Sequence, residues 1–284
     1  MNDSKSFSFR DRLLKAKFST KPFPHWSIPH FFSQEYYDSL TQSLPTSRDI
    51  FSTLNTAYPY QQNTSYRLEL PLNNDSYPEL DTLYNQWNQE RMEILNFLKP
   101  FFSDISIDIT DEILNQSFSR ADFRSSSPVV TSNTTQLGPH CDNPKEVFAG
   151  LIYLRDNDDT SQGGDLDLFE LKPNSPSRYM SNNRRIPLDF IQPCLSIAYA
   201  ANTAIFFLPT EKSIHGVSGR NPTKYERRLI NLSIELPQNS STTMWTVSEF
   251  SFHQHPSLLR RLLARIKYRK QNYSNYNYIS TDML

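Results

Sequence analysis

Residues 138–144 read Gly-Pro-His-Cys-Asp-Asn-Pro, and this stretch guides the interpretation of the whole chain. His140 and Asp142 stand two positions apart at the start of a strand-like run, and alternation along a strand puts both side chains on one face. Another histidine, His215, follows the apolar stretch 203–208. Two imidazoles and one carboxylate on one face of an ion form the triad of non-haem iron(II) sites, which leaves open coordination positions. His140, Asp142 and His215 are the predicted metal ligands.

Each part of this pattern is weak when it stands alone. An H-x-D motif arises by chance in many proteins, and a lone histidine is more often a core or surface residue than a ligand. His253 and His255 form a second candidate pair, but they lead into a helix and no carboxylate follows at the expected spacing. Two histidines and a carboxylate also suit zinc. A zinc-dependent hydrolase and a non-catalytic jelly-roll binding module therefore remain alternatives.

From residue 128 onward the chain takes on the two-residue period of strands, with turn residues between short β-prone segments. The predicted strands are 147–154, 165–171, 195–200, 203–208, 228–236 and 244–250. All six glycines lie between residues 138 and 219, where tight turns and close backbone approaches are expected. These features predict a mainly β fold with flanking helices, namely a double-stranded β-helix (a jelly-roll, cupin-like barrel).

The preceding part of the chain is predicted to support this barrel. Residues 21–32 are rich in proline and aromatic side chains, which suits an extended strand at a sheet edge. Ser33 is a predicted N-cap for a helix that Pro45 ends. A second helix spans residues 80–98, where apolar residues recur at helical spacing, and is expected to end at Pro100.

We expect one domain, because no Gly/Ser-rich or Pro-rich linker divides the chain. The predicted parts of residues 1–284 are a support of helices and strands (1–114), a jelly-roll catalytic core (115–252), and a C-terminal helix with its tail (253–284). Within the last part, a helix over residues 256–270 has leucines on one face and many basic residues. Its apolar face favours packing on the barrel or a homodimer interface over binding to a polyanion.

Composition narrows the classes of partner. Hydrophobic residues make up 37% of the chain and charged residues 21%, as in an ordinary globular domain. A formal net charge of −1 gives no reason to expect nucleic acid or an anionic membrane as partner. No stretch approaches the ~18 apolar residues of a membrane helix, the N-terminus lacks an apolar signal segment, and two cysteines are too few for a disulfide framework. We therefore expect a cytoplasmic protein that acts on a small molecule.

These motifs resemble, in their order along the chain, the 2-oxoglutarate/iron(II) dioxygenases of the prolyl 4-hydroxylase-like superfamily. The matching segments are His140-Cys141-Asp142-Asn143-Pro144, Leu151-Ile152-Tyr153-Leu154, Gly163-Gly164-Asp165-Leu166, His215-Gly216-Val217 and Arg228, within residues 115–236. The resemblance implies that the triad binds Fe(II), that Arg228 binds 2-oxoglutarate, and that O2 is used to oxidise an unactivated C–H bond by hydroxylation or oxidative cyclisation. Peptidyl-proline hydroxylases belong to this superfamily, so a peptide or protein substrate is the alternative to a small metabolite.

Two neighbouring arginines at the start of the strand 228–236, Arg227 and Arg228, are the candidates for binding the distal carboxylate of 2-oxoglutarate. A guanidinium suits a carboxylate better than an ammonium does, because it donates two parallel hydrogen bonds. The apolar side chains at positions 230, 232 and 234 share their parity with Arg228. Alternation along the strand therefore predicts that Arg228 points into the barrel and that Arg227 points away.

Two further positions concern the same cosubstrate. Lys224 stands nine positions after His215, a common spacing for the basic residue in such families, and is the competing anchor. Some relatives have a tyrosine that touches the cosubstrate, and the resemblance places Ile152 at that position. Tyr153 is then expected to point to the other face of its strand.

Arginines near the predicted barrel mouth are candidates for binding the substrate. The candidates are Arg120, Arg178, Arg184 and Arg185, of which the last three lie in the polar loop 172–193. Asp122 and Arg124 follow Arg120 and are expected to line the same mouth. A solvated basic loop would explain the loop arginines equally well. Our interpretation is a carboxylated or amino-acid-like metabolite as substrate, in a biosynthetic reaction.

Overall fold

The structure is a computed structural model that describes residues 7–53, 59–61, 64–72, 76–104, 110–130, 137–173, 186 and 188–245. The predicted helix 256–270, with the proposed dimer interface, lies outside these residues, as do most of the predicted strand 244–250 and the loop residues Arg178, Arg184 and Arg185. Within the described ranges, no helix combines the length and the apolar character needed to cross a membrane.

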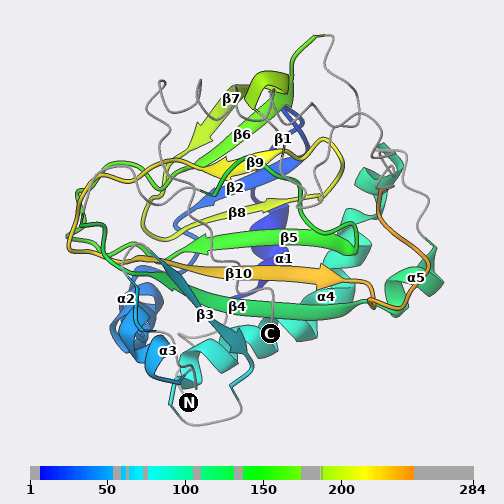
Figure 1. The fold of residues 1–284 in the computed structure, drawn as a ribbon. Helices are drawn as coiled ribbons and strands as arrows, with labels where there is room; N and C mark the ends of the chain where they lie inside the picture. Colours follow the sequence, from blue (N-terminus) through cyan, green and yellow to red (C-terminus); the bar gives the residue numbers. More distant parts are fainter. Residues whose placement is uncertain are drawn as a thin grey trace.

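Seven strands form a large antiparallel sheet in the order β1-β2-β8-β5-β10-β4-β3 (Figure 1). The strands are β1 (Lys17–Ser19), β2 (His25–Pro29), β3 (Ser65–Leu70), β4 (Phe118–Ser126), β5 (Glu146–Tyr153), β8 (Thr203–Phe207) and β10 (Arg227–Glu235). Strand β10 is central, because it pairs with β5 on one side and with β4 on the other. Every neighbouring pair is antiparallel, so each strand can be compared with its neighbours by register.

A second, smaller sheet has the order β7-β6-β9, with β6 (Leu166–Leu171), β7 (Ile191–Ile197) and β9 (His215–Val217). Residues 137–140 lie beside β9, because His140 and His215 exchange two backbone hydrogen bonds and the Val217 N–H donates to the Leu137 carbonyl. Along the chain the strands alternate between the two sheets: β4, β5, β8 and β10 belong to the large sheet, whereas β6, β7 and β9 belong to the small one. Residues 137–140, between β4 and β5, lie beside the small sheet. This alternation is that of a jelly roll, so the fold is the predicted double-stranded β-helix.

The two faces of the large sheet bury different cores. On β10, Ile230, Leu232 and Ile234 belong to the main core that the sheet shares with the helices. Leu229, on the opposite face of β10, belongs to a smaller core between the two sheets. This smaller core, here called the barrel interior, contains Phe23, Ala149, Tyr153, Leu166, Leu168, Tyr199, Ile205, Phe207 and Leu229.

Helices pack on the other face of the large sheet, and α1 (Phe9–Leu14) and α4 (Pro78–Asp104) lie behind it in Figure 1. The other helices of this core are α2 (Gln34–Ser43), α3 (Ser47–Thr53) and α5 (Asp111–Asn115). A short 3-10 turn, η2 (Leu188–Phe190), precedes β7 of the small sheet. Helix α2 begins at the predicted cap, where the Ser33 side chain accepts a hydrogen bond from the Tyr36 N–H. Helix α4 packs on the sheet through the fully buried Trp87, whose ring stacks at 6.3 Å from Phe148 and 6.1 Å from Phe206.

Helix α4 does not end at Pro100 but continues to Asp104. A proline inside a helix removes one backbone hydrogen bond and crowds the preceding turn. Aromatic packing next to the proline offsets this cost, because the Phe101 ring lies 4.8 Å from Phe18 and 5.1 Å from Trp26. The tertiary contacts of this turn therefore override the local signal.

Three strands differ from the prediction. Strand β2 is not at the sheet edge, because β1 pairs with its outer side. Strand β7 begins at Ile191 and not near residue 195. Strand β4 precedes residue 128, where strands were expected to begin, and supplies one whole side of the contact with β10. Its polar sequence hides it, since only one of its faces is apolar.

Candidate metal centre

The three predicted ligands come together in space. Nε2 of His140 lies 3.7 Å and Nε2 of His215 lies 3.6 Å from Oδ1 of Asp142. One ligand atom from each residue lies within 4.8 Å of the other two. Atoms that bind one ion at about 2.0–2.2 Å lie about 3–4 Å from one another. The cluster therefore has the spacing of a three-ligand metal site.

Backbone carbonyls orient both imidazoles. Nδ1 of His140 lies 2.9 Å from the Gly138 carbonyl oxygen, and Nδ1 of His215 lies 3.0 Å from the Ser213 carbonyl oxygen. A carbonyl oxygen only accepts, so each Nδ1 carries the proton and each Nε2 presents its lone pair. Because both Nε2 atoms face Asp142, the residues have the donor set and the tautomers that a divalent transition metal requires.

Close packing of two chain segments brings the histidines together. A Cβ atom at Gly216 would lie 2.9 Å from the Leu137 carbonyl oxygen, so only glycine lets residues 137–140 approach β9. Phe207 of the barrel interior packs on the His215 ring, with 4.9 Å between the ring centroids. The metal cluster thus adjoins the barrel interior through His215.

Arg227 is the arginine that enters the barrel interior. It is 8% exposed, and its Nε donates to the Gly164 carbonyl at 2.9 Å. Its guanidinium carbon lies 5.2 Å from the ring centroid of Tyr153 and 5.0 Å from that of Tyr199. Gly164 has φ of +81°, and a Cβ atom there would lie 3.2 Å from the Arg227 side chain. Glycine is therefore needed both for the backbone conformation and for the approach of Arg227.

The prediction that Arg228 points into the barrel is wrong. Arg228 lies on the helix side of the sheet, where its Nη1 donates to the Thr41 carbonyl at 3.3 Å and its Nη2 lies 3.7 Å from Asp156. Both faces of the large sheet are buried, and the most apolar residues of β10 pack against the helices. A residue that shares their face of the strand, as Arg228 does, therefore also points toward the helices. The same reasoning corrects the orientation of Tyr153, which faces the barrel interior, while Ile152 faces the helices.

Two polar atoms in the barrel interior, Nη2 of Arg227 and the hydroxyl of Tyr153, make no hydrogen bond of regular geometry with the described residues, although the two side chains interact with each other. No described carboxylate forms an ion pair with Arg227. Burial raises the pKa of Tyr153 to about 12 despite the opposing effect of Arg227, so the hydroxyl keeps its proton near neutral pH. Buried donors are normally satisfied. These two are therefore arranged to receive an anionic acceptor, and a carboxylate fits them.

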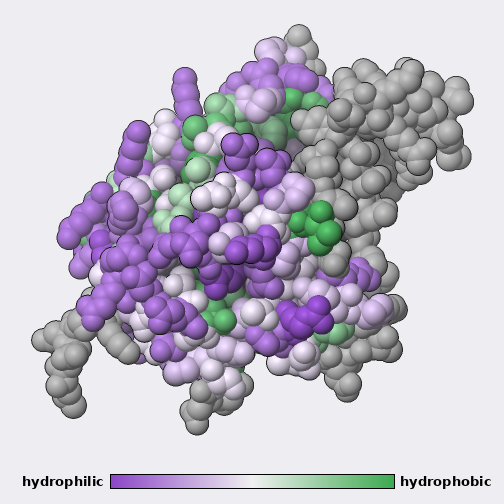
Figure 2. All heavy atoms as spheres, turned by 90° about the vertical axis from the view of Figure 1, so that its left-hand side faces the viewer, coloured by the Kyte–Doolittle hydropathy of each residue, from purple (hydrophilic) through white to green (hydrophobic). Residues whose placement is uncertain are grey.

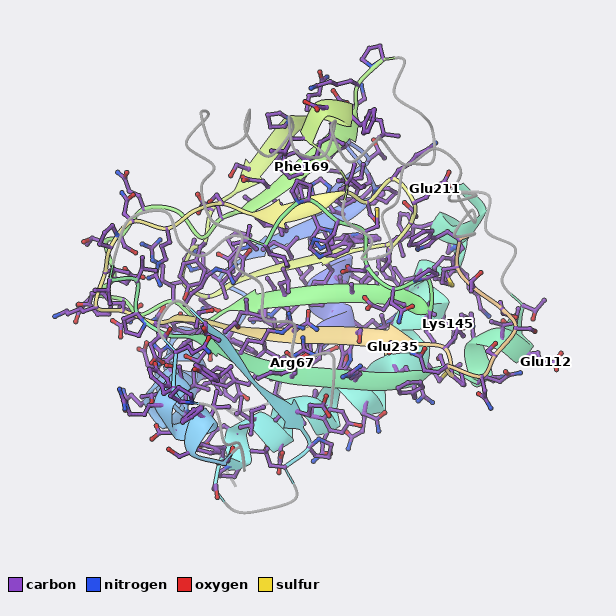
Figure 3. The ribbon with its side chains drawn as sticks, viewed as in Figure 1. Arg67, Glu112, Lys145, Phe169, Glu211 and Glu235 are labelled. Carbon is purple, nitrogen blue, oxygen red and sulfur yellow. The ribbon has the colours of Figure 1, made fainter. Side chains whose placement is uncertain are left out.

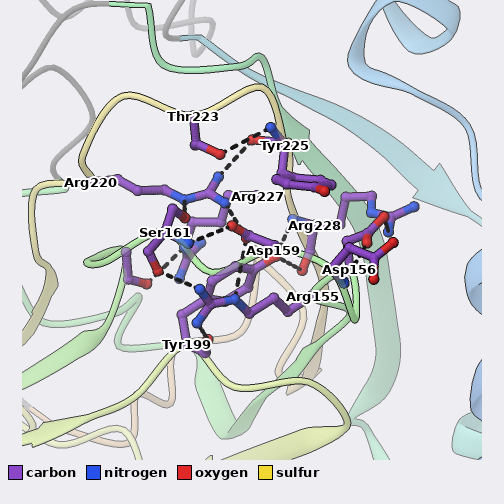
Figure 4. A network of polar contacts seen from close by, with 12 residues as sticks. Arg155, Asp156, Asp159, Ser161, Tyr199, Arg220, Thr223, Tyr225, Arg227 and Arg228 are labelled. Atoms are coloured by element: carbon purple, nitrogen blue, oxygen red, sulfur yellow. Dashed lines mark hydrogen bonds and ion pairs between the residues drawn. The ribbon is translucent and has the colours of Figure 1, made fainter.

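A polar network supports this end of the barrel interior (Figure 4). The fully buried carboxylate of Asp159 accepts a hydrogen bond from Nη2 of Arg220 and lies 3.2 Å from Nε of Arg155. Arg220, 2% exposed, also donates to the Ser161 hydroxyl at 3.1 Å and to the Tyr225 carbonyl at 3.0 Å. Burial raises the pKa of Asp159, but Ser161 and the two arginines outweigh burial and lower it. The carboxylate therefore stays ionised between two guanidinium groups.

Tyr199 joins this network to the strand that carries Arg227. Its hydroxyl accepts from the Arg228 N–H at 2.9 Å and lies 3.3 Å from the Arg228 carbonyl oxygen. The guanidinium carbons of Arg155 and Arg220 lie 5.4 and 5.5 Å from its ring centroid. Tyr199 thus packs against three guanidinium groups. The sequence did not indicate this role of Tyr199, because no motif or regular spacing relates the loop before β8 to the start of β10.

Two other predicted residues lie elsewhere. Lys224 is exposed and stacks on the Tyr225 ring at 5.1 Å, so it does not enter the barrel interior. Arg120 donates to Glu69 at 2.8 Å and lies 3.9 Å from Glu235, so both ends of its guanidinium have acidic partners.

The end of the molecule seen in Figure 2, the left-hand side of Figure 1, shows mainly hydrophilic side chains, and β10 begins at this end.

Neither a protein-family model nor a curated protein matches this chain. Among solved structures, a prolyl 4-hydroxylase from Phytophthora capsici is 15% identical, with 76% of this chain and 59% of that chain covered and a TM-score of 0.44. A prolyl-4-hydroxylase from Pseudomonas putida is 15% identical, with coverage of 80% and 96% and a TM-score of 0.45. An oxidoreductase of the 2OG-Fe(II) oxygenase family from Burkholderia pseudomallei is 17% identical, with coverage of 74% and 84% and a TM-score of 0.41.

The class of this protein follows from its own geometry. The strand order defines a double-stranded β-helix. The cluster of His140, Asp142 and His215 defines a candidate two-histidine, one-carboxylate metal centre at its barrel interior.

Proposed function

We propose that this protein is an iron(II)- and 2-oxoglutarate-dependent oxygenase. One observation carries the proposal: Arg227 is a buried guanidinium without a carboxylate partner among the described residues, and it shares with the Tyr153 hydroxyl a barrel interior that adjoins the three-ligand cluster. Three protein ligands leave coordination positions open for a second ligand. A molecule with a chelating end and a distal carboxylate would use both features.

Each residue has a defined part in this proposal. His140, Asp142 and His215 would hold the iron through two Nε2 atoms and one carboxylate oxygen. Arg227 and Tyr153 would donate hydrogen bonds to the distal carboxylate of 2-oxoglutarate. With O2, iron and 2-oxoglutarate supply the oxidising chemistry for a C–H bond and release succinate and carbon dioxide. Apolar side chains of the barrel interior exclude water from the space between the two anchors.

For the substrate, we propose a small carboxylated or amino-acid-like metabolite, which would undergo hydroxylation or oxidative cyclisation. A peptidyl-proline hydroxylase is the alternative of the same reaction class. A zinc-dependent hydrolase would use the triad but would give no role to a buried arginine that has no carboxylate partner in the described part of the chain. A binding module without catalysis would give no role to the open positions of the metal.

Anaerobic titration tests the cofactor assignment. Addition of iron(II) and then 2-oxoglutarate to the protein should produce a weak visible metal-to-ligand band that saturates with 2-oxoglutarate. Zinc in place of iron, or succinate in place of 2-oxoglutarate, should give no band. Absence of the band with an iron-loaded protein would overturn the proposed function.

A further inference from the structure

A segment that follows β10 lies against the loop that joins the metal ligands to β5. The Leu236 N–H donates to the Lys145 carbonyl at 2.8 Å, and the Met244 N–H donates to the Pro144 carbonyl at 2.7 Å. The segment 236–244 is therefore tied at both of its ends to the two residues directly before β5. Neither metal binding nor 2-oxoglutarate binding, as proposed above, uses these contacts.

The ammonium group of Lys145 adds a second set of contacts to the same segment. Its Nζ donates to the Thr242 carbonyl at 2.7 Å and to the Ser240 carbonyl. A turn shapes this part of the segment, because the Ser240 N–H donates to the Pro237 carbonyl at 2.9 Å. Figure 3 shows Lys145 at the start of β5, near Glu235 at the end of β10. No acidic residue in the described part of the chain forms an ion pair with Lys145, so its charge is directed at the two carbonyls.

A short turn joins Lys145 to the metal ligand Asp142. The Asn143 side chain accepts from the Lys145 N–H at 3.1 Å, and the Asn143 carbonyl accepts from the Glu146 N–H at 2.8 Å. An asparagine that bonds the backbone two residues further on closes a tight turn of this kind. The backbone of Asp142 therefore leads directly into a turn that the segment 236–244 holds in place.

The histidines of the site are supported in a different way from the carboxylate. His140 and His215 exchange two backbone hydrogen bonds, and Nδ1 of each ring lies against a backbone carbonyl. The Asp142 carboxylate accepts no hydrogen bond within the described ranges, and its polar neighbours there are the two Nε2 atoms at 3.7 and 3.6 Å. The orientation of Asp142 thus depends on how firmly the backbone of its own loop is held.

We propose that Lys145 is a positioning residue for the metal: its ammonium group holds the segment 236–244 against the loop and thereby fixes Asp142. The inference rests on the metal centre of the proposed function, but not on the cosubstrate or the reaction. A ligand that is held in place before the metal arrives loses less conformational freedom on binding. Groups that orient metal ligands contribute about 10–100-fold to metal affinity, so Lys145→Met should weaken iron(II) binding at least about tenfold.

The cosubstrate should respond much less. Arg227 begins β10, whereas Lys145 lies beside the end of this strand. The affinity of the iron-loaded Lys145→Met protein for 2-oxoglutarate should therefore change less than about threefold, because the two sites are far apart.

A double-mutant cycle separates positioning from a general loss of stability. Nickel(II) is the probe, because it binds nitrogen and oxygen ligands more tightly than iron(II) and should keep a measurable affinity after one ligand is lost. Lys145→Met should lower nickel affinity at least about tenfold when Asp142 is present, but less than about threefold in the Asp142→Ala background. Isothermal titration calorimetry measures the four dissociation constants. Equal effects in the two backgrounds would overturn the inference.

Lys172→Met is the matched control. The Lys172 ammonium group also donates to two backbone carbonyls, those of Leu188 and Asp189, each at 3.2 Å, but these residues belong to the connection between β6 and β7. Its effect on nickel binding should be the same with and without the Asp142 side chain, and a coupling as large as that of Lys145 would contradict the inference. Lys145→Arg can keep both carbonyl contacts and should retain most of the affinity.

Two further outcomes distinguish this inference from the proposed function. If Lys145→Met does not fold, Lys145→Gln takes its place in the cycle, with the same coupling to Asp142 expected. A wild-type protein that binds metal but gives no visible band with 2-oxoglutarate would refute the proposed function and leave the positioning role in place. A wild-type protein that binds neither iron(II) nor nickel(II) would refute both.

Discussion

The guanidinium of Arg227 lies over the ring of Tyr153, with 5.2 Å between the guanidinium carbon and the ring centroid. The two residues come from neighbouring strands, β10 and β5, and each keeps one polar atom that makes no hydrogen bond of regular geometry with the described residues. Stacking of a guanidinium on an aromatic ring fixes its plane. The N–H groups of Arg227 and the phenol are therefore oriented before any ligand arrives.

The two neighbouring arginines should differ in their effect on cosubstrate binding. Arg227→Met should weaken 2-oxoglutarate binding by about 2–5 kcal/mol, or about thirtyfold to several-thousandfold, because a buried charge-assisted pair is lost. Arg228→Met should change it much less, since Arg228 contacts α2 and Asp156 on the other face of the sheet. Anaerobic titration of the visible band gives both dissociation constants. A larger effect at Arg228 would contradict the position of Arg227 in the barrel interior.

Tyr153→Phe separates binding from stability. The hydroxyl makes no hydrogen bond of regular geometry in the described structure, so its removal should leave the thermal unfolding temperature unchanged or slightly raised without 2-oxoglutarate. Binding of 2-oxoglutarate should weaken about twofold to tenfold, the usual contribution of one hydrogen bond. Differential scanning calorimetry and the same titration measure the two effects. Unchanged affinity would exclude Tyr153 as a donor to the cosubstrate.

Loss of a metal ligand should weaken iron binding without unfolding the protein. We expect iron(II) binding to weaken more than about 100-fold in each of the variants His140→Ala, Asp142→Ala and His215→Ala. Loss of a group that only orients a metal ligand costs up to about 100-fold, and loss of the ligand itself should cost more. His30→Asn is the matched control, because His30 is exposed, far along the chain from the triad, and has φ of +50°, which asparagine tolerates. Equilibrium dialysis without oxygen measures iron binding, and circular dichroism checks folding. Retained affinity in any ligand variant would remove that residue from the site.

The carboxylate of Asp159 should make stability depend on pH. Asp159→Asn leaves Arg220 buried without its charged partner, and we expect a loss of about 3–5 kcal/mol in the free energy of unfolding at pH 7. The pKa of Asp159 is lower in the folded than in the unfolded chain, so its contribution is complete above the unfolded pKa and fades as the pH falls through the folded one.

The difference in the free energy of unfolding between wild type and Asp159→Asn should therefore begin to narrow as the pH falls below about 5 and should keep narrowing until the pH is below the folded pKa. Urea unfolding at a series of pH values measures it. Asp158→Asn is the control, because Asp158 is exposed on the same turn. A difference that stays constant with pH would show that the ion pair does not carry this stability.

Substitution of two glycines should affect 2-oxoglutarate binding and iron binding separately. Gly164→Ala places a Cβ atom 3.2 Å from the Arg227 side chain and should weaken 2-oxoglutarate binding while iron binding is kept. Its positive φ should also cost about 1–2 kcal/mol of stability. Gly216→Ala places a Cβ atom 2.9 Å from the Leu137 carbonyl and should instead weaken iron binding. Parallel titrations with iron and with 2-oxoglutarate compare the variants, and an identical pattern for both would contradict this division.

The sequence by itself determined the features that depend on local spacing. The two-residue interval from His140 to Asp142 places both side chains on one side of the chain, and the structure brings them together with His215. Alternating apolar residues located β5, β6, β8 and β10, and Ser33 located the start of α2, because caps and strand periods act over a few residues.

Only the tertiary structure decided which face of β10 the barrel encloses. Alternation divides the strand into two faces, but both are buried, one by helices and one by the small sheet. The apolar positions 230, 232 and 234 pack against the helices, and the face that carries Arg227, Leu229 and Asn231 meets the barrel interior. The alternation of apolar residues indicates that a residue is buried, but it does not indicate which element of the structure buries it. The identity of the buried arginine, its pairing with Tyr153 and the support from Tyr199 therefore depend on contacts between strands and loops that lie far apart along the chain.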